Sequence, residues 1–187
     1  MEHEVVRIIA NALADAESGV GPVLALVPRS AGDALPATPA IYDETRDNFA
    51  ALEEMPDELP AGVNFPCLVV TMGGGRVAFD PARPRPTRGA LAQGEFEATV
   101  NVHYFTKDSS PAAARRSARY TLRAVRGAIT TLWSPQRVAD RELNKVMLEV
   151  LAGLECISLF QPLEHVSIAG ACAIQVRGRE LFPSLTP

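Results

Sequence analysis

The most regular pattern along the chain is a strict alternation of apolar and polar residues over 95–105. The apolar positions are Phe96, Ala98, Val100, Val102 and Tyr104. The positions between them are Glu97, Thr99, Asn101 and His103. Because successive side chains of a strand point to opposite faces, this period of two predicts a strand with one buried face and one polar face.

Solid apolar runs predict two further strands, over 65–72 and 166–176. One face of the second run is expected to carry Val166, Ile168, Cys172, Ile174 and Val176. Three glycines, Gly73 to Gly75, follow the first run and predict a turn before a short strand over 76–79. Shorter apolar stretches over 23–27 and 156–161 are additional strand candidates.

Apolar residues spaced three and four apart predict an amphipathic helix over 2–17 and a longer one over 111–133. Ser110 is the expected N-cap of the longer helix, Pro111 fits its first position, and Pro135 marks its end. Its apolar stripe consists of Ala114, Ala118, Leu122, Val125, Ile129 and Leu132. A further helix is expected near 138–152, and a short one over 43–55 with Asp43 as its N-cap.

The order of these elements predicts an α+β fold with a mostly antiparallel sheet and helices packed on one face. The strands come in adjacent groups rather than alternating strictly with helices. A length of 187 residues fits a single domain over 1–187. Within it we expect an acidic, proline-rich insertion over 28–64 and an Arg/Pro loop over 80–94.

Composition narrows the class of protein. The chain is 47% hydrophobic, which excludes a fully disordered protein, and its net charge of −4 argues against binding nucleic acid through bulk charge. No apolar run approaches the roughly 20 residues of a membrane-spanning helix, so we expect no membrane partner. The three cysteines, Cys67, Cys156 and Cys172, show no CxxC spacing and predict buried thiols in a reducing compartment.

Candidate chemistry is weak throughout the sequence. The run from Gly73 to Arg76 lacks the Lys-Ser/Thr of a phosphate loop and lies between two predicted strands. The three histidines, His3, His103 and His165, are not spaced as a local metal pair. We therefore expect a protein that is not an enzyme and that uses no cofactor and no metal.

The helix over 111–133 carries an unusual basic face. Its five arginines are Arg115, Arg116, Arg119, Arg123 and Arg126, and it contains no acidic residue. At 100° per residue these arginines fall within about 100° of arc, beside the apolar stripe. Three interpretations stay open at this point: a solvated basic face, a surface that meets an acidic partner subunit, or a contact with DNA.

Two segments of opposite charge are further candidates for an interface. The Arg/Pro loop contributes Arg83, Arg85 and Arg88. The acidic segment over 43–58 contributes Asp43, Glu44, Asp47, Glu53 and Glu54. In a self-assembling protein, one segment could meet the other across a symmetric interface, although both could equally be unrelated solvent-exposed loops.

The order of segments resembles a known family. An N-terminal helix precedes "FPCLVVTM", which is followed by "FEATVNVHYFTKD", then by the helix "SSPAAARRSARYTLRAVRGAI" and a late strand "SIAGACAIQVRG". Over roughly 65–180 this arrangement is similar to the tail terminator, or tail-completion, proteins of long-tailed bacteriophages and related tail-like particles. That family has no catalytic signature to transfer to this chain.

The resemblance implies a structural virion protein of the tail and neck, assembled in the host cytoplasm. Such a subunit forms a homo-oligomeric ring, usually a hexamer, at the head-proximal end of the tail tube. Its partners would be other copies of itself, the tail tube protein and the head-side connector or stopper protein, with DNA passing through the ring. The alternatives are another neck component, such as a head-closure or head–tail joining protein, and a small cytoplasmic enzyme or ligand-binding domain.

Overall fold

The computed structural model describes residues 2–43, 62–78, 92–108, 110–132, 146–150, 155–157, 161–162 and 167–182. The helices are α1 (Glu2–Leu13), α2 (Val20–Leu26) and α3 (Pro111–Leu132). The strands are β1 (Ala40–Asp43), β2 (Cys67–Ala78), β3 (Ala92–Thr106), β4 (Val146–Val150), β5 (Glu155–Ile157), β6 (Gln161–Pro162) and β7 (Ser167–Phe182).

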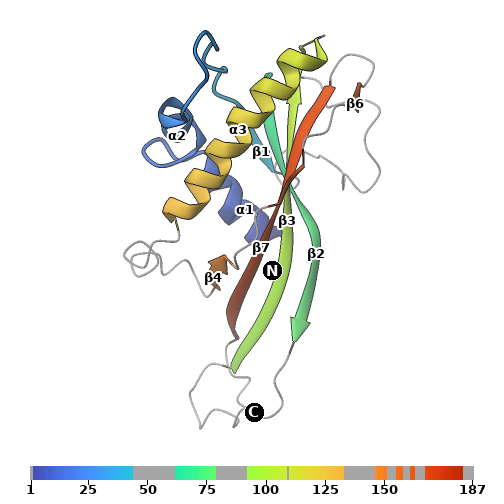
Figure 1. Ribbon diagram of the computed structural model, residues 1–187. Helices are drawn as coiled ribbons and strands as arrows, with labels where there is room; N and C mark the ends of the chain where they lie inside the picture. Colours follow the sequence, from blue (N-terminus) through green and yellow to red (C-terminus); the bar gives the residue numbers. More distant parts are fainter. Residues whose placement is uncertain are drawn as a thin grey trace.

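The strands form one mixed sheet whose order is β1-β2-β3-β7-β4, with β5 and β6 also pairing along β7. Only the β1–β2 pair is parallel among the described strands, and the other pairs are antiparallel. All three helices lie on one side of the sheet (Figure 1). The predicted α+β fold with a mostly antiparallel sheet and helices on one face is therefore confirmed.

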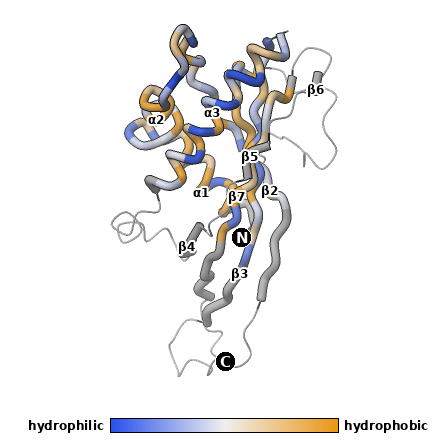
Figure 2. Tube along the Cα trace, in the orientation of Figure 1, coloured by the Kyte–Doolittle hydropathy of each residue, from blue (hydrophilic) through white to orange (hydrophobic). Residues whose placement is uncertain are grey.

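The main core lies between the helices and the sheet. Helix α1 packs over β1 and β2, and α3 packs over β7 and β3. The predicted face of β3 contributes Ala98, Val100, Val102 and Tyr104 to one buried cluster. From the predicted stripe of α3 the same cluster contains Ala114, Ala118, Leu122, Val125 and Ile129. Polar and apolar residues alternate along α3 in Figure 2, as expected of a helix with one buried face. The far ends of β2, β3 and β7 extend past α1 and α3 (Figure 1).

Helix α1 ends at Leu13, four residues before the predicted end at residue 17. The carboxylate of Asp15 closes the turn that follows, since its Oδ1 accepts hydrogen bonds from the Ser18 backbone N–H (2.7 Å) and the Ser18 hydroxyl (2.8 Å). Gly19 fits here because a Cβ at that position would lie 2.4 Å from the Asp15 carbonyl oxygen. This tight turn leads directly into α2.

The predicted strand over 23–27 is wrong, because this stretch belongs to α2. Val20 and Leu24 are buried four residues apart, whereas Leu26 is 80% exposed, which is helical rather than strand periodicity. A short apolar run does not by itself distinguish a strand from a buried helical turn. Helix α2 lies close against α3, where a Cβ added at Gly127 would be 2.7 Å from Val23 Cγ1.

The predicted glycine turn at 73–75 is also wrong. Strand β2 runs through it to Ala78, with a register shift between Met72 and Gly74 against β3. A Cβ at Gly73 would lie 2.5 Å from the Asn101 side-chain nitrogen, so glycine admits that side chain from β3. The glycines therefore accommodate a β-bulge and a close approach rather than a reversal of the chain.

Strand β7 does not keep one face from end to end. Tyr104 pairs with Gly170 but Phe105 pairs with Ile168, so Ala169 is an extra residue that inverts the alternation. Ile168 consequently packs with Cys67, Val69 and Phe105 on the far face of the sheet, away from the helices. The prediction that Ile168 shares a face with Cys172, Ile174 and Val176 is thus wrong, and Val166 lies outside the described residues.

Two helices expected from the sequence are not observed where the structure describes the chain. Within 138–152, residues Val146–Val150 form β4, because the edge of β7 offers them antiparallel partners from Val176 to Glu180. Asp43 is the last residue of β1 and not a helix N-cap. The rest of 43–55 lies outside the described residues, as do residues 80–91 of the predicted Arg/Pro loop. Residues 92–94 of that predicted loop belong instead to β3, which pairs with β7 from Ala92 onward.

Candidate functional site

Helix α3 presents all five of its arginines on its outer face. The helix begins as predicted, because the Ala113 N–H donates to the Ser110 hydroxyl at 3.5 Å and the Ala114 N–H to the Ser110 carbonyl at 2.9 Å. Its inner side is occupied by buried residues, among them Ala114, Ala118, Leu122, Val125 and Ile129. Arg115, Arg116, Arg119, Arg123 and Arg126 are all exposed. We call these five residues the arginine face.

The carboxylate of Asp33 pairs with one arginine of this face, Arg116. The Arg116 guanidinium lies 3.1 Å from Asp33 Oδ1, and the Tyr120 hydroxyl donates a 2.6 Å hydrogen bond to Asp33 Oδ2. The Tyr120 hydroxyl in turn accepts a 3.2 Å hydrogen bond from the Ser30 N–H. Asp33 was not among the candidate residues predicted from the sequence, although it lies within the predicted insertion over 28–64. Asp33 lies in the segment between α2 and β1, so its contacts with Arg116 and Tyr120 hold that segment against α3.

The remaining arginines differ in their surroundings. Arg119, Arg123 and Arg126 make no ion pair with any residue that the structure describes. Arg115 does have an interaction partner. Like charges at this spacing repel one another unless an anion lies near them. The outer face of α3 is therefore a concentration of positive charge, in which Arg119, Arg123 and Arg126 have no ion-pair partner among the described residues.

The predicted acidic candidates are not brought to this face where they are described. Asp43 is 2% exposed at the end of β1, so its carboxylate is inside the fold. Glu44, Asp47, Glu53 and Glu54 lie outside the described residues. Arg83, Arg85 and Arg88 also lie outside them.

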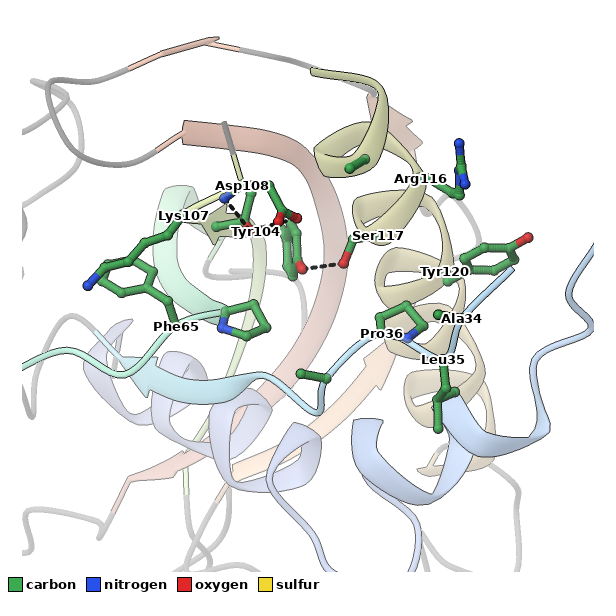
Figure 3. A pocket seen from close by; sticks show the side chains of 14 residues that line it. Ala34, Leu35, Pro36, Phe65, Tyr104, Lys107, Asp108, Arg116, Ser117 and Tyr120 are labelled. Carbon is green, nitrogen blue, oxygen red and sulfur yellow. Dashed lines mark hydrogen bonds between the residues drawn. The ribbon is translucent and has the colours of Figure 1, made fainter. Parts of the chain in front are cut away.

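A pocket of about 540 Å³ adjoins the first turns of α3. Its walls come from residues 34–37, from Phe65 and Pro66 before β2, from the end of β3 and from α3. Figure 3 shows Lys107 and Phe65 on one side, Arg116 and Tyr120 on the other, and Tyr104 between them. Segments far apart in sequence build this pocket, so the sequence carried no local signal for it.

Hydroxyl groups form the inner part of the pocket. The Tyr104 and Ser117 hydroxyls are hydrogen-bonded at 2.6 Å (Figure 3). Burial raises the pKa of Tyr104, and the hydrogen bond with Ser117 opposes that rise. The Thr106 hydroxyl donates to Asp108 Oδ2 at 3.2 Å, so this carboxylate is already engaged. These groups can donate and accept hydrogen bonds, but they do not constitute an activated nucleophile.

The mouth of the pocket is cationic on one side and apolar beneath. Lys107 is exposed, and its Nζ lies 4.8 Å from the centroid of the Phe65 ring. That distance is within the range of a cation–π interaction. The contact orients the ammonium group above an aromatic surface without neutralising it.

Burial shifts the pKa of two other side chains. Burial raises the pKa of the Cys67 thiol to about 12 and lowers the pKa of His103. Cys172 is buried as well. Among the described residues, no group of three or more His, Cys, Asp or Glu residues could hold a metal ion. None of the described helices has the length and apolar character to cross a membrane.

Comparison with known proteins gives no match: no protein-family model fits the chain, and no curated protein resembles it closely enough to be matched. The features of the molecule that bear on its function are therefore the fold, the arginine face and the pocket.

Proposed function

We propose that this chain is a structural subunit of the neck of a long-tailed phage or a related tail-like particle. In this role it forms a ring on the head-proximal end of the tail tube, ends tube polymerisation and joins the tail to the head-side connector. The observation that carries the proposal is the arginine face. Five exposed arginines stand on one helix, and Asp33 pairs with one of them, Arg116.

The arrangement suits an assembly contact better than a site for nucleic acid. Helix α3 is fixed to the sheet by its buried stripe, so its arginines are presented from a rigid surface. Arginine is well suited to pairing with carboxylates at interfaces because its planar guanidinium binds them in a fixed geometry. The chain as a whole has a net charge of −4, which makes an acidic protein surface the more fitting partner than DNA.

Deleting the gene for this chain from the genome that encodes the particle tests the proposal. We expect tails of uncontrolled length and heads without tails, with normal particles restored when the chain is supplied. Tails of normal length beside unjoined heads would indicate another neck component instead. Complete, infectious particles in the absence of the chain would contradict the proposal.

A further inference from the structure

The pocket beside α3 combines a place for apolar groups with cations at its mouth. Leu35, Pro36, Phe65 and Pro66 line it, and Leu35 remains 48% exposed although its side chain is large and apolar. Lys107 and Arg116 line opposite sides of the pocket, and Asp108 lines it beside Lys107 (Figure 3). A volume of about 540 Å³ is within the range of sites that bury a ligand or several side chains.

The chain itself shows how a carboxylate is held at this wall. Asp33 accepts a hydrogen bond from the buried Tyr120 and pairs with Arg116. On the opposite wall, Lys107 makes no ion pair with a described residue, and its contact there is with the Phe65 ring. A carboxylate brought in beside the outer side of Phe65 would therefore lie near the Lys107 ammonium. The pocket thus offers an apolar floor together with one cation, Lys107, that has no ion-pair partner among the described residues, which suits a segment carrying both apolar and acidic residues.

We propose that the pocket receives the acidic segment 44–58 of a neighbouring copy of this chain, and the choice of a neighbouring copy rests on the proposed function. The segment carries six acidic residues and one basic residue, Arg46. Its apolar residues include Phe49, Leu52 and Met55, and Pro56 follows them. A pocket on one copy that binds a different surface of the next is a head-to-tail contact, which closes into a ring when the rotation permits.

Peptide binding tests the pocket directly. The receptor is the full chain in which Glu53, Glu54, Asp57 and Glu58 are changed to their amides, so that its own segment does not compete. A fluorescent peptide of residues 44–61 is titrated with this receptor and followed by anisotropy. We expect saturable binding that Lys107→Glu weakens about tenfold, because a favourable contact becomes a repulsive one.

Arg29→Glu is the matched control, because Arg29 belongs neither to the arginine face nor to the pocket lining. It makes the same charge change at an exposed position outside α3. We expect it to alter the affinity by less than about twofold, and a peptide of the same composition in scrambled order to bind at least about tenfold more weakly. Equal effects of both charge reversals, or equal binding of both peptides, would overturn the proposal.

Mixing two variants tests whether the segment comes from a neighbouring copy. One variant has the amide substitutions, and the other has Lys107→Glu. By light scattering each variant alone should stay monomeric. An equimolar mixture should give a one-to-one pair, because the amide variant supplies an intact pocket and the Lys107→Glu variant supplies an intact acidic segment. Peptide binding without pairing would show that the segment binds its own chain and would overturn the proposal. If the chain with the single substitution Lys107→Glu still completes tails, the pocket contact alone is overturned and the proposed function stands.

Discussion

The hydroxyl of Tyr120 donates a 2.6 Å hydrogen bond to the carboxylate of Asp33, which lies 87 residues earlier in the chain. This bond joins the connection between α2 and β1 to the helix that carries the arginine face. It also leaves the second Asp33 oxygen to pair with Arg116. The shape of one pocket wall therefore depends on a single acidic side chain in a loop.

Asp33→Ala should lower the free energy of unfolding by about 1–3 kcal/mol, because hydrogen bonds to charged groups contribute in that range. Arg116→Ala should cost less than about 1 kcal/mol, since its side chain is 57% exposed and surface ion pairs contribute little. Urea denaturation of both variants measures the difference. A larger loss for Arg116→Ala would show that the ion pair, and not the Tyr120 bond, secures the loop.

Leu122→Ala should lower the free energy of unfolding by about 2–5 kcal/mol, as large-to-small core substitutions do. Leu122 is 4% exposed in the stripe that packs on the sheet, whereas Leu26 on α2 is 80% exposed. Leu26→Ala is therefore the matched control, with an expected change within about 0.5 kcal/mol. A loss below 1 kcal/mol at Leu122 would mean that the stripe is not part of the core.

Gly127→Ala should destabilise the protein even though alanine favours helices by about 1 kcal/mol over glycine. The added Cβ would lie 2.7 Å from Val23 Cγ1, and overpacking of this kind typically costs about 1–3 kcal/mol. In a Val23→Ala background the same substitution should become neutral or stabilising. Thermal unfolding of the four proteins in this cycle measures the coupling, and additive effects would contradict the close packing of α2 on α3.

The sequence was sufficient where the determining pattern is local. The alternation around Val100 and Val102 placed one face of β3 in the core, and Ser110 and Pro111 located the start of α3. Each of these signals is contained within a few consecutive residues, so no tertiary contact is needed to interpret it.

The errors arose where distant partners decide the structure. A bulge at Ala169 moved Ile168 to the far face of the sheet, and pairing with β7 drew Val146–Val150 into a strand. The pocket has the same origin, because residues near positions 35, 65, 105 and 116 meet only in the folded chain. The role of Asp33 could not be predicted without knowing that Tyr120 lies opposite it.

Raising the pH should destabilise the protein partly through Cys67. Burial raises the pKa of this thiol to about 12 in the folded state, whereas an exposed thiol has a pKa near 8.5. The folded state therefore keeps a proton that the unfolded state loses, so the contribution is complete below about pH 8.5 and is lost as the pH rises toward 12. Between pH 8.5 and 10.5 the wild type should lose about 2 kcal/mol more than Cys67→Ala loses, at about 1.4 kcal/mol per pH unit. Equal slopes in urea titrations would show that the thiol does not contribute.

Reversing charge on the arginine face should separate folding from assembly. Arg115 and Arg119 are exposed and lie off the apolar stripe, so Arg115→Glu combined with Arg119→Glu should change the free energy of unfolding by no more than about 1 kcal/mol. An acidic partner surface would repel the two new carboxylates, and like charges brought together at an interface cost several kcal/mol. We therefore expect the double variant to fold but to fail in tail completion or head joining, measured as infectious particles and by electron microscopy. The double variant Arg7→Glu with Arg29→Glu changes the net charge equally at exposed positions outside α3 and should assemble normally. If the α3 variant also yields normal numbers of infectious particles, the arginine face is a solvated surface and not a contact.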